Sequence, residues 1–213
     1  MPDISILVAL FNSQPYIGRL AASISYQVST IPQASIEIIV HDDSPFANTT
    51  ARELCQSLSI PDTVSITVLP QGGCIGPYKS YNKLISASRG TYLWLPGHDD
   101  NFFGNFLSSS YFFLRSNRHY VLAYAPYVAF DYRLLCVSRI EVIPHLDTIH
   151  PCQRYSSYWH TLFTAPIQGL ISRSYLSSNA PFKSSYGADH LFLTALLLLS
   201  LIHISEPTRR YAI

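Results

Sequence analysis

The chain has 213 residues, of which 48% are hydrophobic and 13% are charged, and its formal net charge is +1. This length and apolar content are enough for one sizeable domain that folds around its own core without disulfide or metal staples. With this near-neutral charge, nothing in the sequence suggests electrostatic steering toward nucleic acid or an anionic membrane.

No targeting segment is predicted. An apolar run follows Met1–Asp3 directly, without a basic region, and the longest apolar run, Leu191–Ile204, is shorter than the roughly 20 residues that span a bilayer. The four cysteines lack CxxC spacing and are predicted to be free thiols in a reducing compartment, with a disulfide pair as the alternative. We therefore expect a cytoplasmic protein, and leave open a peripheral association at the inner face of the membrane.

Apolar strands and amphipathic helices alternate as far as Ala125. The predicted strands are Ile4–Leu10, Ile36–His41, Val64–Leu69, Tyr92–Leu95 and Tyr120–Ala125. The helices predicted between them run from Ile17 to Gln27, from Asn48 or Thr49 to Leu58, from Gly76 to Ser88, and over Phe103–Ser116. This alternation is typical of an α/β fold with a mostly parallel central sheet flanked by helices.

The pattern changes after Tyr127. Leu134–Val142 is predicted to be extended, His145–Thr164 is irregular and rich in polar and aromatic residues, and Ile167–Ser172 is predicted to be a strand. Asp189 then opens an apolar helix. Because no repeat or linker interrupts this course, residues 1–198 are expected to form one domain with two halves, 1–100 and 101–198.

Residues 199–213 are set apart from that domain. The segment Leu199–Arg209 resembles the translation of a transposase-type sequencing adapter. We therefore predict that 199–213 is a non-native tail and that the natural chain continues past about Leu198. The alternative is a genuine amphipathic tail.

Two aspartate pairs follow predicted strands. Asp42-Asp43 comes directly after Ile36–His41, and Asp99-Asp100 comes shortly after Tyr92–Leu95. Carboxylates beside a core are costly unless a cation or a hydrogen-bond donor meets them, and ligands of open α/β sheets bind at the carboxyl ends of strands. The two pairs therefore predict one ligand cleft, in which one pair can hold a metal ion.

Six segments in order resemble family 2 glycosyltransferases, the inverting type with the Rossmann-like GT-A fold. They are Ile4–Tyr16, Glu37–Thr49, Gly76–Gly90, Tyr92–Asp100, Ile167–Leu176 and Gly187–Phe192. The resemblance covers about Ile4 to Leu198. It implies that 1–100 is the nucleotide-sugar half and that 101–198 is the acceptor half of a single glycosyltransferase domain.

The resemblance implies nucleotide-binding roles in the first half. Asp43 would accept a hydrogen bond from the base, typically uracil, while Ala9 and Phe11 would flank that base. Lys79 would reach the sugar or the diphosphate as a point charge. The alternatives are that Asp43 caps the following turn or helix and that Lys79 is an ordinary solvated cation.

By the same resemblance, Asp99 and Asp100 would hold Mg²⁺ or Mn²⁺ against the diphosphate, with Asp99 also contacting the nucleotide. The fullest family pattern has another aspartate where this chain has Gly97, and it usually has serine at Pro45. The alternative is that Asp99-Asp100 caps the helix predicted after it.

Asp189 would be the general base that takes the proton of the acceptor hydroxyl. The family often has an acidic pair here, and Ala188 replaces its first member. The alternative is a helix N-cap, which aspartate also favours. The aromatic residues Tyr155, Tyr158 and Trp159 either shape the acceptor pocket or cover the sheet.

The resemblance thus implies an inverting glycosyltransferase of hexosyl type that uses a nucleoside diphosphate sugar, expected to be UDP-linked. The acceptor would be a hydroxyl of a glycan or of a lipid-linked sugar in polysaccharide biosynthesis, and no nucleic acid partner is expected. One alternative is a non-catalytic relative, because Gly97 and Ala188 replace common acids. The other is a sugar-nucleotidyl transferase, but Leu10–Tyr16 lacks the glycine-rich basic loop of that class.

Overall fold

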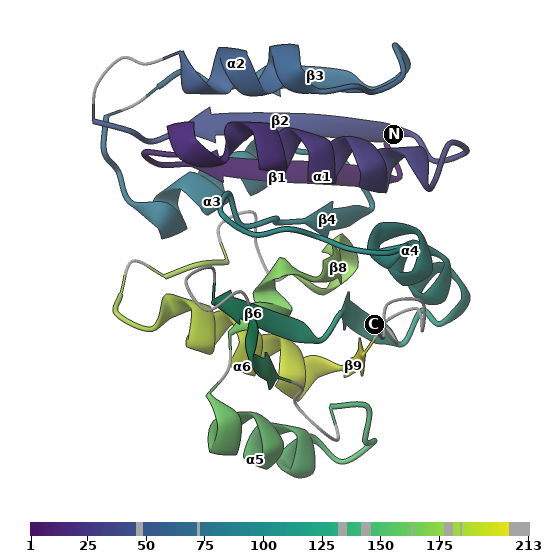
Figure 1. Ribbon diagram of the computed structural model, residues 1–213. Coiled ribbons are helices and arrows are strands. Elements are labelled where there is room, and N and C mark those ends of the chain that lie inside the picture. The colour runs from purple at the N-terminus through teal and green to yellow at the C-terminus, as the bar shows by residue number, and fades with distance from the viewer. Residues whose placement is uncertain are drawn as a thin grey trace.

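The computed structural model describes residues 1–45, 49–71, 73–131, 136–141, 146–162, 164–176, 181–183 and 185–204. Within these ranges a seven-stranded sheet forms the centre of the molecule, in the order β3-β2-β1-β4-β8-β5-β9 (Figure 1). Its strands are β1 Ile4–Leu10, β2 Ile36–Asp42, β3 Ser65–Val68, β4 Tyr92–Trp94, β5 Tyr120–Tyr124, β8 Leu170–Ser172 and β9 Leu201–Ile204. Only the two pairings of β8 are antiparallel in this sheet, so the predicted mostly parallel α/β fold is confirmed.

Helices cover both faces of the sheet. The helices are α1 Ile17–Ser29, α2 Thr50–Ser57, α3 Pro77–Ala87, α4 Phe106–Ser116, α5 Pro151–Thr161 and α6 Ala188–Leu199. Helices α1, α2 and α4 share one apolar core with the sheet, while α3, α5 and α6 share the other. Strand β1 contributes side chains to both cores. Ile6 and Val8 belong to the first core and Leu7 to the second, because successive side chains of a strand point to opposite faces of the sheet.

The expected irregular course of His145–Thr164 is wrong for its central part, which forms the helix α5. The apolar periodicity is weak here because a buried arginine occupies one of the inward positions. Arg154 is 3% exposed, and its guanidinium donates to the carbonyl oxygens of Leu197 (2.8 Å) and Thr148 (2.7 Å). Together with Tyr158 one turn later, it supplies the helix's buried face.

Residues 201–204 form the edge strand β9, which pairs in parallel with β5. Ile202 is fully buried, and its N–H donates to the carbonyl oxygen of Leu146 (3.1 Å). The start of the predicted tail therefore has a place in the sheet. Its adapter origin stays a prediction, and residues 205–213 lie outside the described residues.

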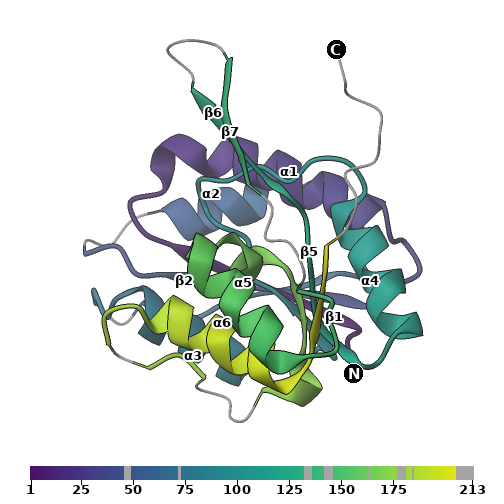
Figure 2. The same ribbon diagram turned by 90° about the horizontal axis from the view of Figure 1, so that it is seen from below.

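A two-stranded hairpin stands apart from the central sheet. Strands β6 Tyr127–Asp131 and β7 Cys136–Glu141 pair antiparallel, and Figure 2 shows the hairpin projecting from the body. Strand β7 lies within the predicted extended segment Leu134–Val142, whose remaining residues are outside the described ranges.

Among the described residues, no helix combines the length and the apolar character needed to cross a membrane.

Gly90 lies where the chain enters β4 against the start of β1, and replacing it by alanine is expected to destabilise the fold. A Cβ atom there would lie 2.5 Å from the backbone nitrogen of Ser5 and 2.8 Å from the carbonyl carbon of Ile4. Such overpacking against backbone costs roughly 1–3 kcal/mol. Denaturant unfolding should show this loss for Gly90→Ala.

The matched control is Gly18→Ala in α1, where a Cβ meets nothing within 4 Å. Alanine in a helix interior is favoured over glycine by roughly 0.5–1 kcal/mol, so the control should be as stable as the parent or more so. Equal effects of the two substitutions would contradict the close packing at Gly90.

Candidate functional site

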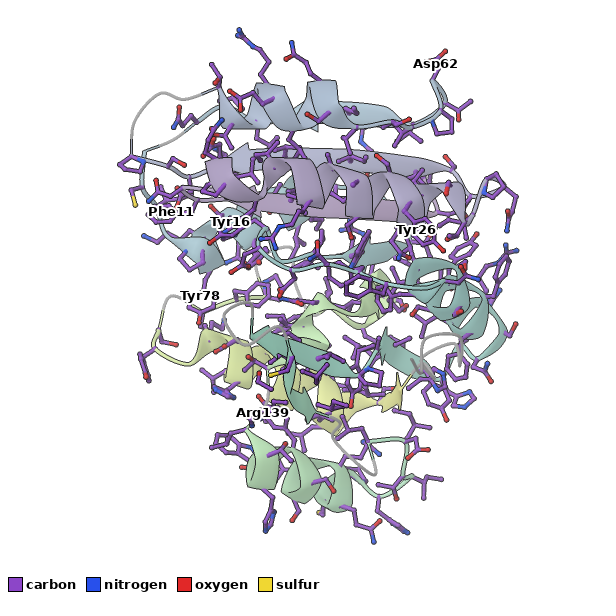
Figure 3. All side chains as sticks on the ribbon, viewed as in Figure 1. Phe11, Tyr16, Tyr26, Asp62, Tyr78 and Arg139 are labelled. Atoms are coloured by element: carbon purple, nitrogen blue, oxygen red, sulfur yellow. The ribbon has the colours of Figure 1, made fainter. Side chains whose placement is uncertain are left out.

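The predicted functional residues gather at one edge of the sheet. Strands β1 and β2 run in parallel with Leu10 opposite Asp42, and β4 runs parallel to β1, so the loops after all three strands leave the same edge. The first residues of α3 and α6 also lie there. Figure 3 places Phe11 and Tyr78 toward this edge, away from Tyr26 and Asp62.

Asp43 fastens the start of α3 to the end of β2. Its side chain is 3% exposed, and its two carboxylate oxygens accept hydrogen bonds from the backbone N–H groups of Ile75 (2.8 Å) and Gly76 (2.7 Å). Helix α2 has Thr49 at its N-cap, so Asp43 does not cap it. The carboxylate is thus a structural anchor between β2 and α3, whatever else it binds.

The neighbouring Asp42 has one carboxylate oxygen without a hydrogen-bond donor, a feature that the sequence did not predict. Its Oδ1 accepts from the backbone N–H of Ser44 (3.0 Å) and from the Ser44 hydroxyl (2.6 Å). Its Oδ2 is buried, and no described residue donates a hydrogen bond to it. A buried carboxylate oxygen without a donor is costly, so Asp42 is the member of the pair that keeps an unpaired acceptor oxygen.

The other predicted nucleotide residues lie at the same edge of the sheet. Ala9 is half-buried near the end of β1, and Phe11 just beyond it is 44% exposed. Asn12, with φ of 50°, turns the chain there, and its N–H donates to the Ser44 hydroxyl (3.0 Å). Lys79 is exposed in the first turns of α3.

A buried polar group holds α3 against β2 beneath these loops. His41 is fully buried, with Nδ1 2.9 Å from the Ser80 hydroxyl and Nε2 3.0 Å from Nζ of Lys83. Burial, with a contribution from the charge of Lys83, lowers the pKa of His41. The neutral ring therefore accepts from Lys83 at Nε2 and donates to Ser80 from Nδ1.

Asp100 is positioned by a residue from the second half of the chain. Gln168, in a short 3₁₀ helix just before β8, donates from Nε2 to Oδ2 of Asp100 (2.5 Å). A Cβ at Gly97 would collide with both Asp100 and Gln168. Any larger residue at position 97 would therefore have to displace the ends of the Asp100 and Gln168 side chains.

The acidic pair has the character of a hard-cation site. Burial raises the pKa of Asp100, and the charge of the exposed Asp99 adds to the rise. Burial, together with the charges of Asp100 and Asp99, also raises the pKa of Tyr81 to about 12, which places this tyrosine of α3 beside the pair. Helix α4 has Asn105 at its N-cap, so neither aspartate caps it.

Within the described ranges no group of three or more histidine, cysteine or acidic side chains could hold a metal by itself. Two carboxylates that need further oxygens fit a Mg²⁺ or Mn²⁺ ion whose remaining ligands are phosphates and water.

Asp189 lies at the start of α6, in contact with α3. It belongs to the first turn of α6, whose N-cap is Gly187, so the alternative of an N-cap aspartate does not hold. Its Oδ1 accepts from the hydroxyl of Tyr78 on α3 (3.3 Å) and from the N–H of His190 (2.9 Å).

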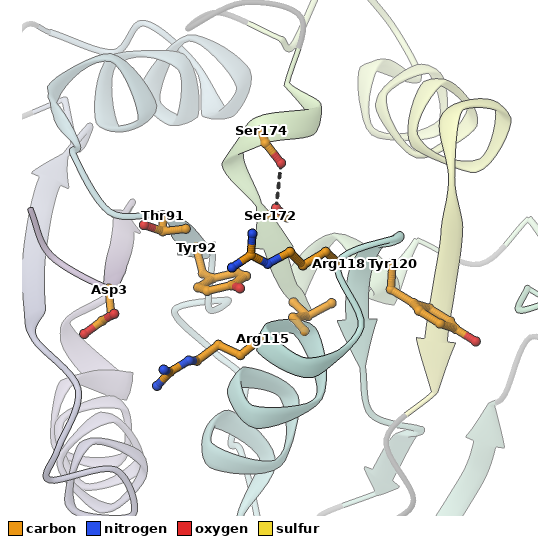
Figure 4. A pocket seen from close by; sticks show the side chains of 9 residues that line it. Asp3, Thr91, Tyr92, Arg115, Arg118, Tyr120, Ser172 and Ser174 are labelled. Carbon is orange, nitrogen blue, oxygen red and sulfur yellow. Dashed lines mark hydrogen bonds between the residues drawn. The ribbon is translucent and has the colours of Figure 1, made fainter.

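A separate pocket of about 390 Å³ lies at the opposite edge of the sheet (Figure 4). Its lining includes Asp3, Tyr92, Arg115, Arg118, Ser172 and Ser174. Nearby, Arg173 donates from Nε to the carbonyl oxygen of Gly90 (2.6 Å) and so ties β8 to the entry of β4. None of the predicted site residues lines this pocket.

Comparison with solved structures supports the fold. The S. aureus TarS fragment 1–349 in complex with UDP-GlcNAc aligns with a TM-score of 0.66 at 16% identity, covering 99% of this chain and 60% of that one. The mannosyltransferase PcManGT from Pyrobaculum calidifontis, in complex with GDP-Man and Mn²⁺, gives 0.65 at 13% identity, covering 99% and 59%. Glucosyl-3-phosphoglycerate synthase from Mycobacterium tuberculosis, with Mn²⁺, UDP-Glc and phosphoglyceric acid, gives 0.59 at 16% identity, covering 96% and 70%.

This chain spans 35% of the longer S. aureus TarS chain. No curated protein matches its sequence. A family model described as glycosyl transferase family 2 matches residues 5–178, which is most of the chain and includes β1 to β8. The chain therefore belongs to glycosyl transferase family 2.

Proposed function

We propose that this protein is an inverting glycosyltransferase that moves a hexosyl group from a UDP-linked sugar to a hydroxyl of a glycan or lipid-linked acceptor. One observation carries the proposal: the pairs Asp42-Asp43 and Asp99-Asp100 lie at the same sheet edge as Asp189. The Tyr78 hydroxyl joins α3, which borders the nucleotide half, to Asp189 in the acceptor half.

In the proposed reaction, Asp189 takes the proton of the acceptor hydroxyl as that oxygen attacks the anomeric carbon. The bond from the anomeric carbon to the diphosphate oxygen breaks, and the nucleoside diphosphate leaves with the electron pair. Attack from the face opposite the leaving group inverts the anomeric carbon. Asp99 and Asp100 would hold a divalent cation, which neutralises charge on the departing diphosphate when it is bound.

The base of the nucleotide is proposed to bind between the ends of β1 and β2. Phe11 offers an exposed ring, and Ala9 leaves room beside it. The acceptors proposed for a ring N–H such as that of uracil are Asp43, whose oxygens also accept from Ile75 and Gly76, and the buried, unpaired Oδ2 of Asp42. The TarS and glucosyl-3-phosphoglycerate synthase structures contain UDP-sugars, which supports UDP as the nucleotide.

The two alternative functions are less well supported by the site. An acid at position 97 would displace the ends of Asp100 and Gln168, so the arrangement of these two side chains goes with glycine there and offers a structural reason for the missing acid other than lost activity. A sugar-nucleotidyl transferase would need a basic phosphate loop after β1, and Phe11–Ser13 supplies none. A cytoplasmic role in polysaccharide biosynthesis, with peripheral attachment to a membrane, is part of the proposal.

Metal-dependent nucleotide binding tests the proposal. At UDP concentrations near 100 times Kd, binding should add about 2.7 kcal/mol to the free energy of unfolding, or roughly 5–10 °C in Tm, with Mn²⁺ or Mg²⁺ present. Chelation should reduce that shift, because the diphosphate then meets Asp99 and Asp100 without a cation between them. Differential scanning fluorimetry with UDP, metal and chelator in all combinations measures it.

Asp100→Ala should remove the metal-dependent part of the shift while the protein stays folded. Asp62→Ala is the matched control, because Asp62 is exposed at a distance from the cleft (Figure 3). An equal UDP shift with metal and with chelator in the parent protein would exclude the proposed metal role.

A further inference from the structure

A buried hydrogen bond connects the proposed base region to α5. Helix α5 packs beneath α6 in Figure 1, and the hydroxyl of Tyr158 lies 2.6 Å from Nδ1 of His190, the residue after Asp189. Tyr158 is fully buried, and burial, with a smaller contribution from the charge of Asp189, raises its pKa well above the usual range. Tyr158 therefore keeps its proton and is available as a donor.

This hydrogen bond selects the protonation of the His190 ring. When Tyr158 donates to Nδ1, the proton of the neutral imidazole must lie on Nε2. Among the described residues no hydrogen-bond partner is recorded for Nε2. In this tautomer the half-buried His190 presents an N–H donor from Nε2 next to Asp189.

Two partly exposed aromatic rings, those of Trp159 and Tyr155, lie next to His190 on the surface. The ring of Trp159 stacks on His190, with centroids 6.3 Å apart and planes at 27°, and Tyr155 lies 5.8 Å from Trp159. Trp159 and Tyr155 are each 40% exposed, although both belong to α5, which packs on α6. Large aromatic faces left open beside polar groups are typical of ligand sites.

The order of the groups indicates which substrate this surface meets. Asp189 contacts Tyr78 of α3 on one side, and His190, Trp159 and Tyr155 follow on the α5 side. Helix α3 borders the proposed nucleotide site. The aromatic surface therefore lies beyond the base as seen from the donor, where an acceptor must lie for its hydroxyl to reach Asp189.

Resting on the proposed function, we propose that Trp159 and His190 form the acceptor subsite and that the acceptor is a pyranose ring. The apolar C–H face of the ring stacks on Trp159, and His190 donates from Nε2–H to a ring hydroxyl. These two contacts turn a neighbouring hydroxyl toward Asp189. Tyr158 acts as a positioning residue, because it sets the proton of His190 without touching the sugar.

Intrinsic fluorescence provides a test that does not depend on turnover. The chain has two tryptophans, Trp94 with 0% exposure and Trp159 with 40%, so acrylamide quenching reports on Trp159. UDP-saturated protein is titrated with methyl pyranosides of glucose, N-acetylglucosamine, galactose and mannose, and with sorbitol as an acyclic control. At least one pyranoside should protect Trp159 saturably, and sorbitol should not.

Variants separate the subsite from mere packing, with saturation-transfer NMR on the protective pyranoside as the readout. Trp159→Ala and His190→Ala should each weaken pyranoside binding by roughly tenfold, the size expected for one stacking or hydrogen-bond contact. His190→Gln, which keeps an N–H donor, should recover part of the His190→Ala loss. All three should leave the UDP-induced Tm shift unchanged.

The outcomes distinguish this inference from the proposed function. If UDP binds with metal but no pyranoside protects Trp159, the acceptor subsite is wrong and the nucleotide site stands. If pyranosides bind while UDP does not, the proposed function fails and the saccharide subsite remains. Equal protection by sorbitol and pyranosides would overturn the stacking contact.

Discussion

Asp189→Asn is expected to lower the rate of sugar transfer by roughly 10²–10⁴-fold, the usual contribution of a positioned general base. Asparagine preserves the size of the side chain and an acceptor oxygen for Tyr78 and for the N–H of His190. It cannot take a proton from the acceptor hydroxyl. UDP affinity should stay unchanged, because Asp189 belongs to the proposed acceptor half. Transfer and UDP binding should therefore be measured on the same preparation.

Tyr78→Phe is the matched control for this substitution. It removes the hydroxyl that lies 3.3 Å from Asp189 but leaves the carboxylate in place, so the loss of rate should be small. Transfer by Asp189→Asn at the parental rate would mean that Asp189 is not the base.

Substitutions of Asp42 and Asp43 are expected to have different effects, on UDP affinity for Asp42 and on stability for Asp43. In Asp42→Asn an amide can keep the bonds to Ser44 at Oδ1 and replace the unpaired Oδ2 by a donor. A donor at that position would oppose the N–H of a uracil ring. Loss of a hydrogen bond to a charged group is worth about 1.5–3 kcal/mol, so UDP affinity should fall roughly 10–100-fold with stability nearly unchanged.

Asp43→Asn should show the opposite balance. Its carboxylate meets two backbone N–H groups, and an amide presents a donor to one of them. Leaving that buried donor unpaired costs about 1–3 kcal/mol, which denaturant unfolding would detect. If Asp43→Asn loses UDP affinity without losing stability, Asp43 reads the base and Asp42 does not. Calorimetric titration with UDP completes the comparison.

The outline of the fold follows from local apolar patterns. Ile4–Leu10 is predicted and found as β1 with the same bounds, because a run of buried β-branched residues has few other ways to fold. The acidic pairs are also predicted to lie at one edge, since parallel strands place their carboxyl ends together. Both features depend on residues close in sequence.

Other features depend on contacts between distant residues. The apolar pattern did not predict helix α5, because the charged residue Arg154 occupies one of its buried positions. The carbonyl oxygens that accept hydrogen bonds from Arg154 belong to Leu197 and Thr148, outside that helix. The division between Asp42 and Asp43 depends on which carboxylate meets Ile75 and Gly76, more than 30 residues away. No local pattern carries that information.

The hydrogen bond from Gln168 to Asp100 limits how the protein can be divided. The two predicted halves meet in sequence near residue 100. The Asp100 carboxylate, which is proposed to hold the metal, is nevertheless oriented by Gln168, which lies just before β8 in the second half. Residues 1–100 are therefore not a portable nucleotide-sugar module. A chimera that joined them to a different acceptor half would inherit its metal geometry from the new partner, and would need an amide donor at the position of Gln168.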